Sequence, residues 1–227
     1  MDLKIYFANA EKLEDDGLFK RVYGVMPQYR KDKADRLRFA KDKRLSLAAG
    51  ASLLLAMREA GVPQSAAIAY GEHGKPYFPE YPSFCVSLSH SGEWAMCAAA
   101  DVCVGCDIEK IEGRSERVAN RFFTGEENAY IASFCDDEEM RAAFFRVWTL
   151  RESYMKASGK GFSTPQSSFS VIKGGIICAD AGEYVLAEIP APEGYASSCA
   201  VCCAGKELNI SAAYIDFDGF VNNSMLK

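Results

Sequence analysis

Two acidic residues alternate at the end of an apolar segment, in the sequence Gly105-Cys-Asp107-Ile-Glu109. On a strand, residues two positions apart point to the same face, so Asp107 and Glu109 are expected to project together. Two close carboxylates raise each other's pKa unless a cation neutralises them, and carboxylate oxygens are ligands that Mg²⁺ prefers. The same pattern is equally typical of a strand that ends in solvent. The pair is therefore a candidate metal site with a structural alternative.

A second group of residues is spaced by the helical turn. Trp148, Glu152 and Lys156 stand at positions i, i+4 and i+8 and therefore share one face of a predicted helix. Such a face is typical of a surface ion pair beside a half-buried aromatic ring. It is also suited to supply a third metal carboxylate, or a base, together with a phosphate-binding cation.

A third group lies in two nearby segments, Gly74-Lys75-Pro76 and Ser87-Leu-Ser89-His90-Ser91. Glycine lets the backbone approach a ligand, and Lys75, Ser89 and His90 can bind the oxygens of a phosphate. A serine hydrolase is less well supported, because the G-x-S-x-G pattern is absent and adjacent residues of a strand face opposite sides. A structural histidine is the alternative for His90.

Charge is distributed unevenly along the chain. Its 227 residues carry 26 basic and 31 acidic side chains, a formal net charge of −5, which argues against general nucleic-acid binding. Residues 30–44 nevertheless hold eight basic and three acidic side chains. This basic segment is typical of a solvated helix face and is also suited to binding an anion. With only two histidines, a histidine-rich metal site is not expected.

The N-terminal residues and the cysteines bear on the compartment. Residues 1–7 lack the features of a signal peptide, and the most apolar stretch, residues 45–57, is too short to cross a bilayer, so we expect a cytoplasmic protein. The nine cysteines include two C-x-x-C pairs, at 103/106 and 199/202, in segments that resemble strands. Positions i and i+3 of a strand face opposite sides, so we expect reduced core thiols rather than a zinc site.

The hydrophobic pattern predicts an α+β fold with antiparallel sheets. A first strand is expected at residues 3–8, one helical region from about 33 to 60, and short strands at 66–70, 84–89, 94–100 and 102–109. Thr124 and Glu127 have capping-box spacing, and Asp136 and Asp137 open a longer helix through residues 141–158 that Gly159 ends. Strands at 169–173, 175–179, 184–189, 196–204 and 211–217 complete the pattern.

In order and spacing these segments resemble the 4′-phosphopantetheinyl transferase superfamily, specifically its Sfp-like class, which activates carrier proteins. The resemblance covers residues 28–205 and is carried by Gly74-Lys75-Pro76, Ser89-His90-Ser91, Val104-Gly105-Cys106-Asp107-Ile108-Glu109, Arg121-Phe-Phe-Thr-Gly-Glu-Glu127, Trp148 through Lys156, Gly159-Lys160-Gly161-Phe162 and the Lys43-Arg44 pair. Three positions depart from the family pattern. Arg151 replaces the usual lysine, and Tyr29 and Asp32 stand where relatives often carry basic residues.

The resemblance implies a fold of two pseudo-symmetric lobes, residues 1–101 and 102–227, each with a small antiparallel sheet packed with helices, and an active site in the cleft between them. It implies a cytoplasmic, monomeric, Mg²⁺-dependent enzyme, with Mn²⁺ as an alternative ion and without a nucleic-acid or membrane partner. The implied reaction transfers the 4′-phosphopantetheine arm of coenzyme A to a serine of an apo acyl, peptidyl or aryl carrier protein. Adenosine 3′,5′-bisphosphate is released.

The resemblance also assigns roles to residues of this chain. Asp107, Glu109 and Glu152 are expected to hold the metal, Lys156 to contact the phosphates and the leaving group, and either Glu152 or Glu127 to accept the serine proton. The expected contacts to coenzyme A come from Arg44 with Arg30, Lys31 or Lys33 at the 3′-phosphate, and from Gly74, Lys75, Ser89 and His90. Two rivals remain, a Mg²⁺-dependent phosphohydrolase and a non-catalytic module that binds a nucleotide or a carrier protein.

Overall fold

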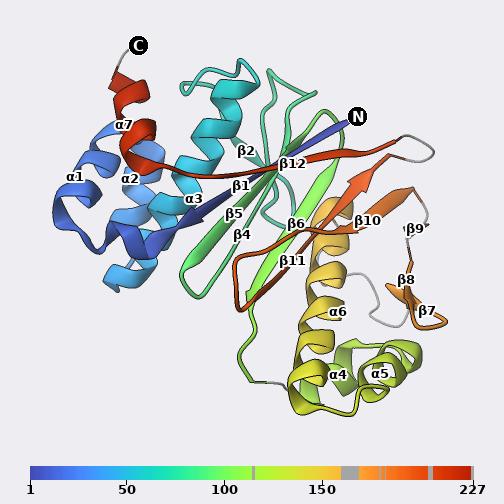
Figure 1. Cartoon of the computed structure of the whole chain (residues 1–227). Coiled ribbons are helices and arrows are strands. Elements are labelled where there is room, and N and C mark those ends of the chain that lie inside the picture. Colours follow the sequence, from blue (N-terminus) through green and yellow to red (C-terminus); the bar gives the residue numbers. More distant parts are fainter. Residues whose placement is uncertain (114–115, 160–168, 179, 182, 204–206, 226–227) are drawn as a thin grey trace.

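Two four-stranded sheets and two groups of helices make up the chain, in a computed structural model that describes residues 1–113, 116–159, 169–178, 180–181, 183–203 and 207–225 (Figure 1). Helices from the first part of the chain gather at the end of the molecule opposite the later helices α4 to α6 (Figure 1). The expected mixed α+β class is confirmed. None of the described helices is long and apolar enough to cross a membrane.

The first sheet has the strand order β12-β1-β5-β4. It consists of β12 (Asn209–Tyr214), β1 (Asp2–Asn9), β5 (Trp94–Ala100) and β4 (Cys85–Ser91). The expectation of purely antiparallel sheets is wrong here, because β12 runs parallel to β1. The chain returns from the second sheet to the end where β1 begins. There the N-terminal ammonium of Met1 donates to the carbonyl of Glu207 at 3.0 Å, so β12 starts beside the start of β1.

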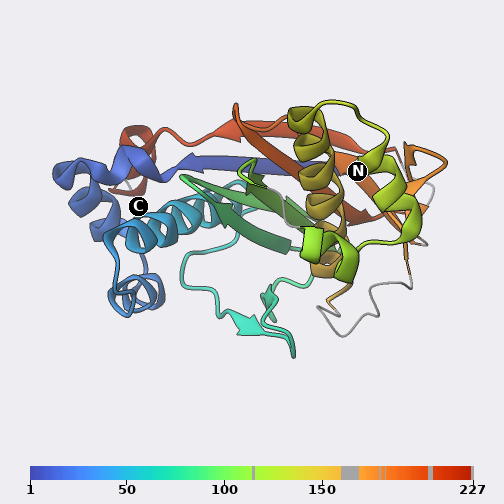
Figure 2. The ribbon, with the colours of Figure 1, turned by 90° about the horizontal axis from the view of Figure 1, so that it is seen from below.

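The second sheet is antiparallel throughout and has the order β6-β11-β10-β9. Its strands are β6 (Val104–Lys110), β11 (Tyr195–Cys202), β10 (Tyr184–Glu188) and β9 (Asp180–Ala181). Two short hairpins lie outside the sheets, β2 (Ala69–Tyr70) with β3 (Pro76–Tyr77), and β7 (Ile172–Lys173) with β8 (Ile176–Ile177). The β2–β3 hairpin projects from the body of the molecule (Figure 2).

The predicted helical region from 33 to 60 forms two helices, α2 (Gln28–Asp35) and α3 (Ala40–Glu59). The chain is extended at Phe39, which lets α2 fold back against α3. Arg30 of α2 then donates to the carbonyl of Ser46 in α3, over a glycine at position 50 whose missing Cβ leaves room for the guanidinium. A single straight helix cannot make this contact, which is why the continuous helix is wrong.

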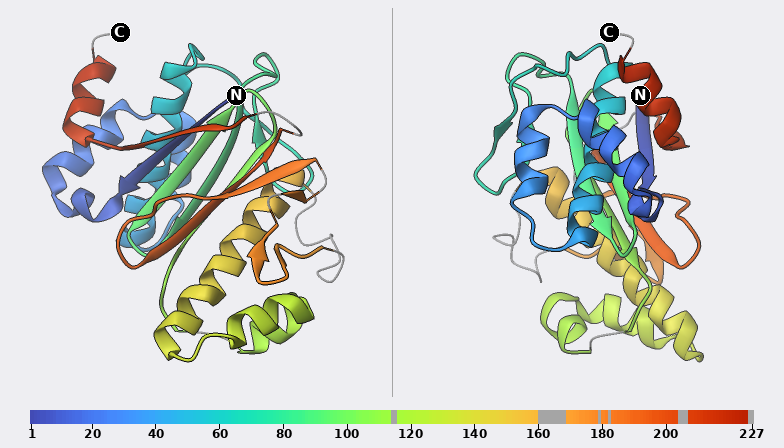
Figure 3. Two further views of the ribbon diagram at one scale, coloured as in Figure 1. Left: turned by 45° about the vertical axis from the view of Figure 1, so that its right-hand side comes forward. Right: turned by 90° about the vertical axis from the view of Figure 1, so that its left-hand side faces the viewer.

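Two elements before α2 have no counterpart among the expected ones, a 3₁₀ helix η1 (Ala10–Glu14) and α1 (Asp16–Val25). Asp15 caps α1 by accepting a hydrogen bond from Leu18 at 2.6 Å. The later helices are α4 (Glu116–Phe122), α5 (Gly125–Ala132), α6 (Asp137–Ser158) and α7 (Phe217–Met225). The α7 helix packs through Phe217, Phe220 and Val221 into the core between the first sheet and the early helices, so α7 lies beside α1 and α3 (Figure 3).

The predicted start and stop signals of α5 and α6 are confirmed. Thr124 and Glu127 form a reciprocal capping box at the start of α5. Asp136 accepts hydrogen bonds from Glu138 and Glu139 at the start of α6, and Gly159 ends this helix with a left-handed φ of 69°. The segment Lys160-Gly161-Phe162, part of the family resemblance, lies outside the described residues.

All nine cysteines are free. Cys97, Cys106, Cys199 and Cys203 are buried, as expected of core thiols. Cys103 and Cys135 are exposed, so the core assignment is wrong for these two, because each stands in a connection between elements rather than inside a strand or helix.

Candidate functional site

The two sheets meet along a seam between β4 and β6 that serine hydroxyls hold together. Serines alternate along β4, and Ser89 donates to Asp107 Oδ1 at 2.7 Å while Ser91 donates to Glu109 Oε2 at 2.6 Å. The hydroxyl of Ser87 accepts the backbone N–H of Cys106 at 3.0 Å. Because residues two apart on a strand share a face, this run of serines aligns the two acidic residues of β6 with β4.

Helix α6 lies directly on β6 because position 105 has no side chain. A Cβ at Gly105 would stand 2.0 Å from the carbonyl oxygen of Ser153 and 2.3 Å from the backbone nitrogen of Ala157. This close approach brings the face of α6 that carries Glu152 and Lys156 to the seam. Lys156 Nζ then lies 2.6 Å from Asp107 Oδ1 and 3.0 Å from Ser89 Oγ.

The carboxylates at this seam are only partly neutralised. Asp107 is 2% exposed, and among the described residues its second oxygen, Oδ2, has no hydrogen-bond partner. Burial, followed by repulsion from Asp107, raises the pKa of Glu152 to about 7. Burial also raises the pKa of Glu109, and the hydrogen bond from Ser91 opposes this change. A cation would relieve the shared repulsion.

The donor chemistry fits a hard divalent cation. The available ligands are carboxylate oxygens, and the buried, unpartnered Oδ2 of Asp107 is the atom that an added cation would satisfy. In the described part of the chain no group of three or more His, Cys, Asp or Glu side chains is arranged as a ready-made metal site.

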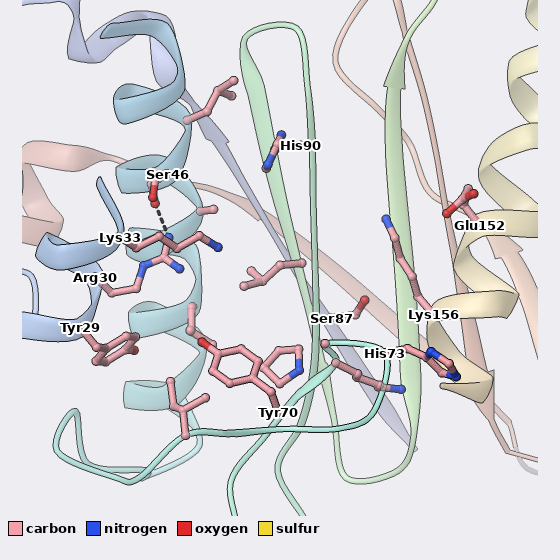
Figure 4. Close-up of a pocket in the computed structure, with 18 of the residues that line it drawn as sticks. Tyr29, Arg30, Lys33, Ser46, Tyr70, His73, Ser87, His90, Glu152 and Lys156 are labelled. Atoms are coloured by element: carbon pink, nitrogen blue, oxygen red, sulfur yellow. Dashed lines mark hydrogen bonds between the residues drawn. The ribbon is translucent and has the colours of Figure 1, made fainter. Parts of the chain in front are cut away.

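A cavity of about 770 Å³ opens beside this seam. Its walls come from α2 and α3 on one side, from α6 on the other, and from β4 and the β2–β3 hairpin between them (Figure 4). Arg30 and Lys33 lie on the α2 side, and Glu152 and Lys156 extend from α6 (Figure 4). The cavity therefore places cations opposite the carboxylate seam.

Most of the residues expected to contact coenzyme A line this cavity. They are Arg30, Lys33, Gly74, Lys75, His90 and Lys156, together with Glu152. Ser89 is buried just behind the wall, where it bonds Asp107 and Lys156. His90 is exposed at the cavity, where loss of surrounding water and the charges of Lys33 and Lys156 lower the pKa of its ring and favour the neutral form near pH 7.

The basic segment divides into three environments. Arg30 is 3% exposed, bonds Ser46, and keeps a buried Nε without a partner among the described residues. Lys33 lines the cavity, and no ion pair to it is seen in the described part of the chain. Arg44 instead pairs with Glu14 at 2.8 Å and is not among the cavity residues, while Lys31 donates to the carbonyl of Gly24.

Glu127 lies apart from the carboxylate seam, in a buried ion pair. It is fully buried, and both its oxygens accept from Arg151 Nη1, at 2.9 and 2.8 Å. The backbone N–H groups of Thr124 and Val171 also donate to it, at 2.7 and 2.8 Å. No described contact joins it to Asp107, Glu109 or Glu152.

Sequence reasoning missed two kinds of site residue. Tyr29, Asp42 and Tyr70 line the cavity but carry no motif of their own. Ser87 and Ser91 hold the seam, and their signal was the spacing of serines at every second position from 87 to 91.

Comparisons with known proteins point to one family. The family model described as "4'-phosphopantetheinyl transferase superfamily" matches residues 103–188, which include the acidic strand and α6. A 4′-phosphopantetheinyl transferase of Bacillus subtilis is 31% identical over 171 residues, covering 74% of this chain and 76% of that protein. The 4′-phosphopantetheinyl transferase psf-1 of Bacillus pumilus is 34% identical over 173 residues, covering 74% of each chain.

A shorter match falls within the same class. The 4′-phosphopantetheinyl transferase Sfp of Bacillus subtilis strain 168 is 40% identical over 100 residues, which is 44% of either chain. The acidic strand, the helix above it and the cationic cavity thus occur in a chain that resembles proteins named 4′-phosphopantetheinyl transferases. The chain belongs to the 4′-phosphopantetheinyl transferase superfamily and is an enzyme of its Sfp-like class.

Proposed function

We propose that the enzyme transfers the 4′-phosphopantetheine arm of coenzyme A to a serine hydroxyl of an apo carrier protein, with Mg²⁺ as the preferred ion and adenosine 3′,5′-bisphosphate as the second product. The serine oxygen bonds to the β-phosphorus, the bond from that phosphorus to the bridging oxygen breaks, and the nucleotide leaves. The observation that carries the proposal is the Lys156–Asp107 contact of 2.6 Å at the edge of a cavity with further cations on its opposite wall.

Asp107, Glu109 and Glu152 are the residues that would hold the metal, because they supply oxygen ligands and because no hydrogen bond to the Oδ2 atom of Asp107 is found among the described residues. The metal would neutralise charge on the diphosphate. Lys156, fixed by Asp107 and Ser89, presents an ammonium to the phosphates and to the departing oxygen. Lys75 and His90 would bind phosphate oxygens from the neighbouring wall.

For the 3′-phosphate we propose Lys33 with Arg30, since both line the cavity on the wall opposite α6. Arg44, which was expected there, would first have to leave its ion pair with Glu14. For the serine proton we propose Glu152, since it lines the cavity whereas Glu127 is enclosed by Arg151 and backbone donors.

We further propose that the enzyme acts as a cytoplasmic monomer with two lobes and the cavity between them. The lobes correspond to residues 1–101 and 102–227, except that β12 and α7 lie with the first sheet and its core. The carrier protein is acidic in this proposal, because the basic segment at residues 30–44 offers the complementary charge. Membership of a transferase family favours transfer over the phosphohydrolase and over the non-catalytic module.

Intact-mass measurement of a carrier protein tests the proposal. An apo acyl carrier protein incubated with the enzyme, coenzyme A and Mg²⁺ should gain one phosphopantetheine, ~340 Da from the chemistry of the arm. The control is the same carrier with its acceptor serine replaced by alanine, which should gain nothing, and a chelator should stop the reaction. Release of inorganic phosphate or of a nucleoside phosphate without a mass gain on the carrier would establish hydrolysis instead.

A further inference from the structure

The register of the β4–β6 seam places two thiols opposite each other. Side chains of β4 meet side chains of β6 eighteen residues later, as in the pairs Ser91 with Glu109 and Ser89 with Asp107. The same offset, continued toward the start of each strand, sets position 85 opposite position 103. Both positions are cysteines.

The structure shows that these thiols interact. Cys85 is the first residue of β4 and is half-buried, whereas Cys103 is exposed in the connection immediately before β6. The Cys103 thiol lies close enough to act on the Cys85 thiol, and after burial, which is the larger cause, it raises the pKa of Cys85. A disulfide needs two side chains that already point toward each other, because strands packed in a core cannot move far.

A third cysteine and a lysine surround the pair. The backbone N–H of Cys202 donates to the carbonyl of Cys103 at 2.9 Å, so Cys202 is a third cysteine near the pair. The ammonium of Lys75, fixed by a 2.8 Å hydrogen bond to the carbonyl of Ala157, lies near both thiols of the pair. Its charge opposes the rise in the pKa of Cys85 that burial causes, and burial is the larger effect.

We propose that Cys85 and Cys103 form a modification site that reacts with low-molecular-weight disulfides and closes to an intramolecular disulfide. The exposed Cys103 thiolate attacks one sulfur of the small disulfide, and that S–S bond breaks to release one small thiolate. Cys85 loses its proton to solvent and attacks the Cys103 sulfur, which releases the second small thiolate. Two electrons pass from the protein dithiol to the small disulfide, and the released thiolates take up two protons.

Treatment of the fully reduced enzyme with oxidised glutathione tests this site. After alkylation of the remaining thiols, digestion without reduction should give a linked peptide pair containing Cys85 and Cys103, which dithiothreitol separates. Cys135, exposed before α6, is the internal comparison in the same digest. Cys135 should form a mixed disulfide with glutathione, and this reaction should be slower than formation of the Cys85–Cys103 disulfide.

Single variants separate the two steps of the reaction. Cys85→Ser should leave glutathione trapped on Cys103, Cys103→Ser should leave Cys85 unlinked, and Cys135→Ser should leave the link unchanged. Thermal unfolding of each reduced variant verifies that it is folded, and serine is small enough for both sites. The proposal is overturned if wild-type Cys103 retains glutathione without closing, or if its linked partner is Cys202.

Discussion

Lys156 crosses from α6 to the seam between the two sheets and holds its ammonium 2.6 Å from Oδ1 of Asp107. Burial alone would lower the pKa of this lysine, but Asp107 reverses the effect and the pKa is raised. The lysine therefore stays charged. In the part of the chain that the structure describes, the other carboxylate oxygen of Asp107 has no hydrogen-bond partner and can accept a further cation.

Replacement of Asp107 by asparagine should abolish Mg²⁺-dependent transfer while the enzyme remains folded. The amide keeps the shape of the side chain but removes the charge that pairs with Lys156 and would bind the metal. We expect kcat to fall by about 10²–10³-fold or more, the size of effect seen when a charge-stabilising group is lost. Transfer rates across a Mg²⁺ titration, with circular dichroism as the folding control, measure this. A variant with wild-type rates would remove Asp107 from the site.

Gly105→Ala should destabilise the enzyme strongly. The added methyl would meet backbone atoms of Ser153 and Ala157, which cannot rotate away as a side chain can. The helix must move off β6, so we expect a loss of about 3 kcal/mol or more in the free energy of unfolding, the upper range for overpacking. Gly24→Ala is the matched control, since that helical position has nothing within 4 Å and should gain ~0.5–1 kcal/mol. Urea titration measures both variants, and equal stabilities would refute the close-packing argument.

Lys33→Ala should raise the KM for coenzyme A more than the KM for 3′-dephospho-coenzyme A. Its ammonium lines the cavity, so loss of the contact should cost ~10-fold in KM when the 3′-phosphate is present. Arg44→Ala should change the two KM values little and equally, because its partner is Glu14. The opposite pattern for these two variants would return the 3′-phosphate to Arg44.

Glu127→Gln should unfold at markedly lower urea, because the buried guanidinium of Arg151 would lose the carboxylate that accepts its hydrogen bonds. Arg151 is 2% exposed, and removing one partner of such a pair costs ~3–5 kcal/mol. Asp218→Asn serves as the comparison. It breaks the exposed Arg21–Asp218 pair and should cost under ~1 kcal/mol. Transfer per folded Glu127→Gln molecule should stay within about tenfold of wild type. A complete loss in the folded fraction would identify Glu127 as the base.

His90 should make the ligand-free enzyme sensitive to acid. Because the folded state lowers the pKa of this ring, folding favours its neutral form, and stability should fall as pH drops below the ordinary histidine value of ~6.5. Stability curves of wild type and His90→Asn should coincide near pH 8. They should separate toward pH 5, with the wild type losing more. Parallel curves over that range would show that the histidine ring is not held in its neutral form.

Local signals in the sequence predicted the elements that carry the chemistry. The capping residues Thr124 and Asp136 marked the starts of α5 and α6, and the strand expected at residues 94–100 is found as Trp94–Ala100. These signals act within a few residues. The position of a side chain in the folded protein depends on distant residues as well. The spacing of basic residues therefore could not show that Arg44 pairs with Glu14 while Lys33 lines the cavity.

Contacts between distant segments explain the other differences. The interruption of the expected helix at Phe39 allows Arg30 to donate a hydrogen bond to Ser46. This contact depends on the absence of a side chain at Gly50. The direction of β12 is set by pairing with β1, some two hundred residues earlier in the chain. The sequence around Arg30 does not show that it will contact Ser46, and the sequence of β12 does not show that it will pair with β1.

The parallel pairing of β12 with β1 also bears on how the protein folds. During synthesis one edge of β1 stays unpaired until residues Asn209–Tyr214 have emerged from the ribosome, and the first sheet cannot be completed before then. The closing of such a long loop is entropically costly and slow, and an open strand edge attracts other chains in the meantime. Expression of residues 1–101 alone would thus yield an aggregation-prone fragment rather than an autonomous half.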